Sequence, residues 1–421
     1  MPLLDDAMGI ADDLAELRHR LHERPEIGLK LHRTQETVLE ALSGLDLEIT
    51  AGKEIGSVTA VLRGTGAPRL PAPGAPAAHT TLTDPEPGLP VVLLRADMDA
   101  LPVHEEVDVP YRSMLDGAMH ACGHDLHTAM LVGAARLLAA NRHRLAGDVV
   151  LMFQPGQEGF DGARKMIDSG VLGAAGRPAD SAFALHVLPN MVSRGQVASR
   201  PGTIMAASDG MFVTVHGIGG HGSSPHLSRD PVPATCEMVL AMQTAINRGI
   251  DAFEPVVVTV GSLQAGTRRN VIPETASFEA TVRTFDRSVR RRVKDLLQLV
   301  CRGIADAHGL EVDIEYLEEY PVTVNDAGAT QVAFDVSAGL FGPARSVVMD
   351  RPITGTEDFS RVIERVPGAM VLLGACVDGR DPATAPSNHS PHAAFDDRSL
   401  PDGAALYAEL ALHQLAPQPS P

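Results

Sequence analysis

The segment 120–125 reads His-Ala-Cys-Gly-His-Asp and places a thiol and an imidazole two positions apart, at Cys122 and His124. Both residues precede an apolar run, 129–138, that is typical of a helix, so they would lie near a helix N-terminus. The positive end of the helix dipole favours a thiolate, the form of cysteine that binds a soft divalent cation. Taken alone, the pair is better explained as a buried thiol beside a surface histidine. The metal interpretation therefore depends on the rest of the chain.

Other side chains that can bind metals follow short apolar runs elsewhere. These are Asp97 and Asp99 after 91–94, Glu158 after 149–153, His186 after 182–185, and His389 in a loop after 370–373. Continuous apolar runs that alternate with helical patterns predict strands buried on both faces of a largely parallel sheet. In such a sheet the ligand crevice lies outside the carboxyl ends of the strands. We therefore expect these polar side chains to converge.

The converging set contains one thiol, three imidazoles and one carboxylate: Cys122, His124, His186, His389 and Glu158. These donors suit Zn²⁺, Co²⁺ or Ni²⁺, and Mn²⁺ is a less natural choice beside a thiolate. Five protein ligands exceed what a single catalytic ion with an open position requires, so the set predicts two ions that share a bridging ligand. Paired ions of this kind activate a water molecule and polarise a carbonyl group.

The elements that must position this site fall into two groups. Amphipathic helices are expected over 5–24 and 34–43, and the Pro- and Ala-rich stretch 64–90 reads as a surface excursion between two strands. Between about 210 and 320 the pattern changes to β-α-β-β-α-β, the order of a ferredoxin-like domain. We therefore predict a discontinuous catalytic domain, 1–200 and 320–421, interrupted by a second domain, 201–319.

Composition narrows the class of protein. The chain has 421 residues, 44% hydrophobic and 21% charged, as expected for a folded protein. Its net charge of −18 argues against nucleic acid or an anionic membrane as a partner. Four cysteines without regular spacing form no disulfide framework, and no leader-like segment or membrane-length apolar run is present. We expect a cytoplasmic protein.

Five motifs then occur in order: Leu-His-Glu-Arg-Pro-Glu at 21–26, Arg-Ala-Asp-Met-Asp-Ala-Leu-Pro at 95–102, the segment 120–125, Gln-Pro-Gly-Gln-Glu-Gly at 154–159, and Asn-His-Ser-Pro at 388–391. In these motifs the chain resembles the M20 metallopeptidases, specifically the amidohydrolase branch that includes hippurate hydrolase, auxin-conjugate hydrolases and aminoacylases. The resemblance covers nearly the whole chain apart from 64–90. It implies an α/β, di-metal exopeptidase-like catalytic domain with a mainly parallel mixed sheet, and an inserted ferredoxin-like lid through which two copies form a homodimer.

The resemblance also assigns roles to single residues. Cys122, His124, Glu158, His186 and His389 match the family's metal ligands, and Asp99 matches the acid that orients the metal site. In the lid, the loop 219–226 matches a glycine-histidine loop whose histidine, His221, would stabilise the oxyanion and reach the partner subunit's site. The remaining two lid residues match positions near the substrate carboxylate, for which an arginine fork is suited: Asn270 and Arg283.

One position departs from the family pattern. Two successive acids normally stand after Gln-Pro, the first as general base and the second as metal ligand, but here they are Gln157 and Glu158. A neutral amide cannot take a proton from water, and general acid–base help is typically worth about 10²–10⁴-fold in rate. Three explanations stay open: an introduced substitution that traps substrate, a native enzyme that handles the proton in another way (for example through Glu105 or Glu357), or a binding protein.

The sequence thus predicts a metal-dependent amidohydrolase that cleaves the amide bond of N-acyl amino acids, slowed by Gln157. The first alternative is a catalytically silenced, metal-containing protein that binds acyl-amino acids. The second is a hydrolase with Cys122 as nucleophile, which would leave Glu158, His186 and His389 without a role.

Overall fold

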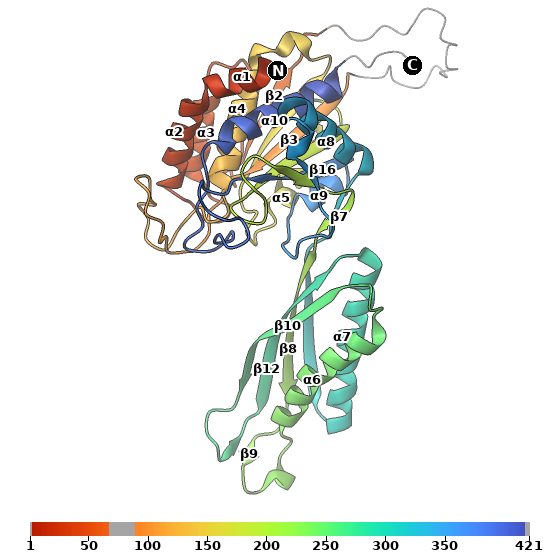
Figure 1. Ribbon diagram of the computed structural model, residues 1–421. Helices are drawn as coiled ribbons and strands as arrows, with labels where there is room; N and C mark the ends of the chain where they lie inside the picture. Colours follow the sequence, from red (N-terminus) through yellow and green to blue (C-terminus); the bar gives the residue numbers. More distant parts are fainter. Residues whose placement is uncertain (1, 67–88, 417–421) are drawn as a thin grey trace, which may run out of the picture. The chain divides into compact units, whose positions relative to one another are not determined.

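The computed structural model describes residues 2–66 and 89–416, so most of the expected excursion 64–90 lies outside the described residues. The chain divides into two compact units, which are drawn in Figure 1. The first unit comprises Met1–Gly202, Val324–Asp350 and Arg361–Pro421, and the second comprises Thr203–Thr323 and Arg351–Ser360. The grouping of 351–360 with the second unit is a feature that the sequence did not indicate.

The first unit is built on a mixed eight-stranded sheet in the order β1-β2-β4-β3-β5-β16-β6-β15. Its strands are β1 (Glu48–Ala51), β2 (Val58–Arg63), β3 (Val91–Asp97), β4 (Asp148–Gln154), β5 (Ser181–Leu188), β6 (Val197–Ser199), β15 (Ser346–Val348) and β16 (Gly368–Gly374). The central strands β4, β3, β5 and β16 run parallel, and each is fully buried. This confirms the predicted α/β fold with a mainly parallel mixed sheet, and its continuous apolar runs reflect burial on both faces.

Helices cover the faces of this sheet. They are α1 (Pro2–Gly9), α2 (Ala11–His22), α3 (His32–Leu42), α4 (His124–Ala140), α5 (Gly162–Asp168), α8 (Ala327–Phe341) and α10 (Ser399–Leu415). One large core joins α1–α4, α8 and α10 to the sheet, and α4 is buried almost all round because it lies against both α10 and the strands. The single helix expected over 5–24 is instead two helices, since the chain turns at Gly9 and Ile10.

The second unit contains a four-stranded antiparallel sheet in the order β10-β12-β8-β13. Its elements are β8 (Ala207–His216), β9 (Gly220–His221), α6 (Pro231–Gly249), β10 (Val256–Ala265), β11 (Val271–Ile272), β12 (Thr275–Thr284), α7 (Arg287–His308) and β13 (Glu311–Tyr320). Both helices pack on one face of the sheet through their apolar sides. Leaving aside the two-stranded sheet of β9 and β11, the order is the β-α-β-β-α-β arrangement expected from the sequence.

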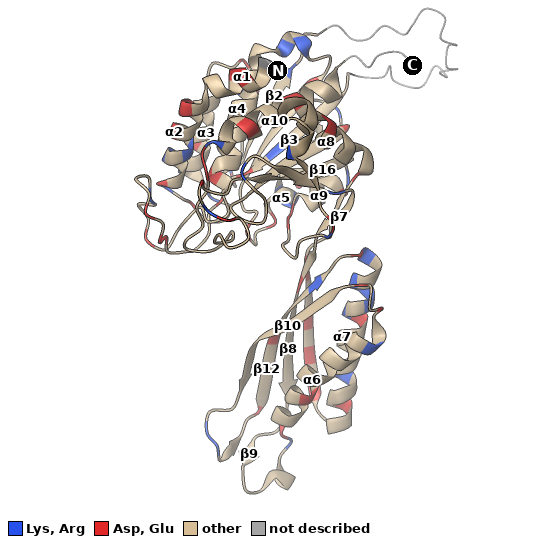
Figure 2. Cartoon of the chain, viewed as in Figure 1, with Lys and Arg blue, Asp and Glu red and all other residues tan. Residues whose placement is uncertain are grey.

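Short elements lie where the chain passes between the units: β7 (Gly202–Met205), β14 (Thr323–Asn325) and α9 (Ser360–Ile363). Acidic and basic residues are interspersed along the elements of both units (Figure 2). Within the described part of the chain, no helix is both long and apolar enough to cross a membrane. Cys236, on α6, is exposed.

Candidate metal centre

The polar groups that follow the apolar runs lie at the carboxyl ends of the parallel strands. Asp97 is the last residue of β3, and Glu158 stands in the loop after β4. His186 lies near the carboxyl end of β5, and His389 belongs to the long loop after β16. The segment with Cys122 enters α4 beside them. The crevice rule for parallel sheets therefore holds for all four strands.

Cys122 and His124 are set at their spacing by a tight turn. Gly123 precedes α4 with φ +82°, in the left-handed region that favours glycine. A Cβ atom at this position would lie 2.4 Å from Cγ2 of Val187 on β5. The turn therefore requires glycine both for its conformation and for close packing, and it aims the thiol and the imidazole to the same side.

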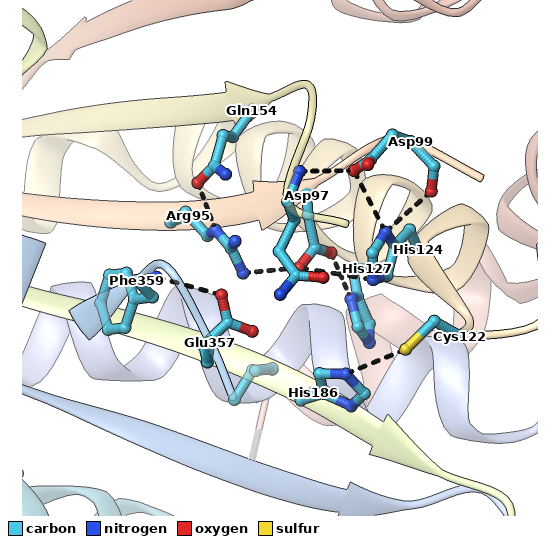
Figure 3. Close-up of polar contacts among 12 residues, drawn as sticks. Arg95, Asp97, Asp99, Cys122, His124, His127, Gln154, His186, Glu357 and Phe359 are labelled. Atoms are coloured by element: carbon cyan, nitrogen blue, oxygen red, sulfur yellow. Dashed lines mark hydrogen bonds and ion pairs between the residues drawn. The ribbon is translucent and has the colours of Figure 1, made fainter. Parts of the chain in front are cut away.

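The first candidate triad is Cys122, His124 and His186, whose ligand atoms lie within 4.8 Å of one another (Figure 3). The Cys122 Sγ atom is 3.4 Å from Nε2 of His186. Nδ1 of His124 bonds to the carbonyl oxygen of Asp99 at 2.8 Å, and its buried Nε2 has no hydrogen-bond partner among the described residues. His186 likewise uses Nδ1 on the carbonyl of Val187 and turns Nε2 to the thiol. Both rings thus present Nε2, as metal-binding histidines do.

The second candidate triad is Cys122, Glu158 and His389, again within 4.8 Å. Nε2 of His389 lies 3.0 Å from a Glu158 carboxylate oxygen. The backbone of His389 has φ +69°, an uncommon conformation for a non-glycine residue, and its N–H donates to the carbonyl of Ala121. The neighbouring Asn388 amide donates to the Cys122 carbonyl at 3.2 Å, so the loop is tied to the cysteine segment.

The electrostatic environment of the two triads favours the binding of a cation. Hydrogen bonds to Cys122 and Glu158 raise the pKa of His389 to about 10. Burial would raise the pKa of Glu158, but the hydrogen bond from His389 and the His124 imidazole outweigh it and lower that pKa. Burial would lower the pKa of His124, but Asp97 and Cys122 raise it well above its usual range. The nearby thiol and carboxylates therefore favour the protonated form of these imidazoles. A bound metal ion would take the place of those protons.

Both triads contain Cys122. The sequence predicted a ligand shared by two ions without saying which residue it is, and that sharing stays a prediction. Thiolate, imidazole and carboxylate donors fit zinc or another late transition metal. The structure thus brings together all five residues, although their role as ligands stays a prediction. A third group with ligand-like spacing is Asp97, His124 and His127.

Asp99 holds the loop after β4 by its carboxylate. One oxygen accepts the N–H of Gln157 and the other that of Glu158, each at 3.0 Å. The backbone carbonyl of Asp99 accepts from His124. Asp99 therefore fixes Gln157 and Glu158 together against the first turn of α4, which is the geometry expected of an orienting acid. Gln157 is buried at this position.

The motif at 21–26 supplies a buried ionic network behind α4. Nδ1 of His22 lies 2.7 Å from Asp125, and Nε2 lies 3.0 Å from Glu105. Arg18 also bonds to Asp125, at 2.7 Å. The second carboxylate oxygen of Glu105 accepts the N–H of Ser113. Because both oxygens of Glu105 are engaged, this residue is a poor substitute for the missing base.

The three candidate residues of the second unit do not form one cluster. His221, on β9, is exposed; its Nδ1 accepts from the Ser223 hydroxyl at 2.7 Å, and the next residue, Gly222, donates to the carbonyl of Asn270. Arg283 stands eight residues beyond Thr275 along β12, roughly 26 Å away at the rise of a strand. Within one chain Asn270 and Arg283 therefore lie toward opposite ends of this unit, and their predicted contacts with a substrate carboxylate stay a prediction.

Sequence reasoning assigned no individual role to three residues beside the site. Asp97 accepts from Arg95 and His127 at 2.6 Å each, and the Arg95 guanidinium and nearby imidazoles hold its pKa well below the usual range against the effect of burial. His127 and Asn388 were not singled out either. His127 lies three residues after His124, a spacing that puts both on one face of a helix, and this spacing could have indicated its place beside the site. Asn388 adjoins His389 in a recognised motif.

Comparison with known proteins defines the class. Residues 93–413 match the model of peptidase family M20/M25/M40. Thermostable carboxypeptidase 2 of Saccharolobus solfataricus is 35% identical over 413 residues, 97% of each chain. Hippurate hydrolase of Campylobacter jejuni is 32% identical over 417 residues, 99% of this chain and 100% of its own length.

The fold is also similar to that of a solved member of this family. YxeP of Bacillus subtilis, described as a dinuclear metal binding peptidase from the M20 family, superposes with a TM-score of 0.79 at 29% identity over 97% of this chain and 99% of its own. The chain belongs to the M20 peptidase family, and it is a metal-dependent amidohydrolase. This confirms the family resemblance drawn from the motifs.

Proposed function

We propose that this protein hydrolyses the amide bond of N-acyl amino acids, using two divalent cations held by Cys122, His124, Glu158, His186 and His389. The observation that carries the proposal is the shared Cys122 thiol, on which both triads converge. Zinc is the proposed metal from the donor set, with manganese, cobalt or nickel as alternatives. When bound, such ions polarise the amide carbonyl and activate water.

In this proposal the side chains of the protein position the metal-binding loop and the reacting water, and they determine how protons can be transferred. Asp99 holds Gln157 and Glu158 through their backbone N–H groups, so the loop that carries the side chain at 157 is fixed beside the site. An amide at 157 can orient a water molecule by hydrogen bonding, but it cannot carry a proton to the leaving nitrogen. The proposed enzyme is therefore slow.

The test is the substitution Gln157→Glu. We expect the rate of hydrolysis of an N-acyl amino acid such as hippurate to rise by about 10²–10⁴-fold, because a carboxylate restores general base catalysis. Gln157→Asn, which keeps a neutral amide, serves as control and should give no gain. Metal content measured in parallel must stay at two ions per chain. An unchanged rate in Gln157→Glu with both ions bound would refute the assigned role.

The alternative of a silenced binding protein makes a different forecast. Calorimetric titration of the wild-type protein with an N-acyl amino acid, followed by long incubation, would then show binding without any product. A substrate-trapping variant of an enzyme gives the same result for the wild type but regains turnover in Gln157→Glu. A second candidate substrate is a peptide with a free C-terminal carboxylate, favoured by the carboxypeptidase of S. solfataricus.

The second unit is proposed to act as lid and dimerisation domain. His221 lies at one end of that unit and Arg283 near the other, so a homodimer could offer Arg283 from one protomer and His221 from its partner to the same substrate. Arg283 is half-buried, with a guanidinium nitrogen that has no hydrogen-bond partner among the described residues, as suits a carboxylate ligand. A cytoplasmic location is also proposed, supported by four unpaired cysteines.

A further inference from the structure

The central sheet of the first unit splits between β3 and β5. These parallel strands pair from Val92 and Ser181 up to Arg95 and Ala184, and there the pairing stops. On the outer sides, β3 continues with β4 to Asp97, and β5 continues with β16 to Leu188. Backbone groups that face the split have therefore lost their strand partner, and buried groups of this kind must be satisfied in another way.

On the β3 side, alternate carbonyl oxygens are taken by side chains. The carbonyl of Arg95 accepts from the Tyr407 hydroxyl, that of Asp97 from the Thr128 hydroxyl at 3.0 Å, and that of Asp99 from Nδ1 of His124 at 2.8 Å. On the β5 side, alternate amides do the same: Leu185 N–H donates to the Tyr407 hydroxyl and Val187 N–H to Nε2 of His127, both at 2.8 Å.

Two side chains therefore span the split and replace missing backbone pairs. Tyr407, from α10, connects Arg95 to Leu185. The Nδ1 atom of His127, from α4, lies 2.6 Å from the Asp97 carboxylate (Figure 3). Its Nε2 atom accepts from the amide of Val187 and so connects the two strands. A carboxylate accepts and an amide N–H donates, so Nδ1 carries the proton and Nε2 its lone pair toward Val187. Both nitrogens of His127 are thus occupied, and the third ligand-like group needs no metal.

We propose that His127 is a positioning residue that holds the split at the width the metal centre requires, with Tyr407 as the second support. The bridged amide belongs to the residue after His186, and the ring of His127 lies 4.8 Å from that of His186 between centroids. His124 belongs to the same series of side-chain bonds, because its Nδ1 bonds to the carbonyl of Asp99 just beyond β3. The bridge thereby sets the place of His186 relative to Cys122 and His124. This inference rests on the proposed function, because it concerns the same centre.

Two substitutions separate the halves of the bridge. The amide of Gln in His127→Gln can reach the place of Nε2 and accept from Val187. The shorter amide in His127→Asn can reach only the place of Nδ1 and bond to Asp97. Both variants lose the ring, and each keeps only one of the two contacts, so their comparison shows whether metal affinity depends on the contact with Val187 or on the contact with Asp97. We expect His127→Asn to bind Zn²⁺ or Co²⁺ about 10–100-fold more weakly than wild type, and His127→Gln to stay close to wild type.

The measurement is titration of the full-length, metal-free protein with Zn²⁺, together with the visible absorption of the Co²⁺ form, which reports ligand geometry. A matched control is Asn325→Ala. Asn325 is another buried residue that tethers a strand of this sheet, bonding to N and O of Met370 on β16, away from the metal centre. Its loss should lower stability and leave metal affinity and the Co²⁺ spectrum unchanged.

Several outcomes would overturn the inference: unchanged affinity in His127→Asn, equal losses in both His127 variants, or an equal loss in Asn325→Ala. If His127→Asn does not fold, Tyr407→Phe removes only the other bridging hydroxyl and should weaken Co²⁺ binding several-fold with an altered spectrum; no effect there would also overturn it. The proposed function fails separately, if the wild-type protein binds no divalent cation at all. Two ions bound by every variant with wild-type affinity would leave the function standing and the bridge refuted.

Discussion

At the residue scale, the centre depends on the turn that carries Cys122, because one sulfur atom belongs to both triads. Its neighbour Gly123 has φ +82° and leaves no room for a side chain: an added Cβ would lie 2.4 Å from Val187 and 3.1 Å from Phe395. Any residue other than glycine must move the chain between two of the proposed ligands.

We therefore predict that Gly123→Ala costs about 1–3 kcal/mol of unfolding free energy through overpacking and strain, and lowers metal affinity as well. Urea unfolding and Zn²⁺ titration measure the two effects. Gly117→Ala is the matched control, because Gly117 has φ +76° but nothing within 4 Å of an added Cβ. It should show strain alone, about 1 kcal/mol, with normal metal binding. Normal metal binding in Gly123→Ala would contradict the prediction.

The proposed ligands were accessible from the sequence because they stand in short, ordered motifs. The contacts of Asp97 were not, because Asp97 and Asp99 are two positions apart on an extended chain and the sequence does not say which helix faces them. Only the packing of α4 beside β3 makes His127 the partner of Asp97 and leaves Asp99 to hold Gln157 and Glu158.

At the element scale, apolar runs predicted the buried strands well, since each of β3, β4, β5 and β16 is buried along its whole length. The split between β3 and β5 could not be predicted, because it depends on where pairing ends and on side chains from two helices. The break between α1 and α2 was also missed: the apolar pattern continues across it, and Gly9 alone does not end a helix.

The contact of α2 with α4 gives a pH prediction. Burial disfavours a charged His22, but the carboxylate of Asp125 outweighs it and raises the pKa of His22. A raised pKa stabilises the folded state fully below the unfolded value of about 6.5, and this contribution is lost as pH rises through the folded value. For Asp125 and Glu105 the burial effect is outweighed by Arg18 and His22, respectively, and their pKa values are lowered. Their contribution is lost as pH falls below about 4.

The network should therefore stabilise the metal-free protein most between about pH 4.5 and 6.5. His124 and His389 also have raised pKa values in the metal-free protein, so the loss of unfolding free energy above pH 6.5 has several sources. In His22→Gln this loss should become shallower by at most about 1.4 kcal/mol per pH unit, the share of one proton. Urea unfolding at a series of pH values measures this. His143→Gln, at an exposed histidine, should keep the wild-type pH profile. A slope above pH 6.5 in His22→Gln that equals the wild-type slope would show that the network does not contribute in this way.

At the scale of the whole molecule, the change of pattern near 210 and 320 predicted an inserted unit, and the structure divides the chain close to these positions. No sequence pattern indicates that 351–360 groups with that unit, because the segment is short and has no periodicity of its own. Nor could a motif reveal that His221 and Asn270 lie at one end of the unit and Arg283 near the other, since this follows from the strand register.

That register leads to a prediction about assembly. If His221 serves the partner's centre, a protomer with Cys122→Ala still offers His221, and one with His221→Ala still offers an intact metal centre. Each variant alone should be inactive or nearly so. After unfolding and refolding as an equimolar mixture, random pairing puts half of the chains in mixed dimers, each with one competent centre, so activity should return to about a quarter of the parent value. Each of the two variants is made in a Gln157→Glu background, in which the parent activity is high enough for a quarter of it to be measured. A mixture that stays as inactive as its components, although light scattering shows dimers, would place His221 in its own protomer's site or outside catalysis.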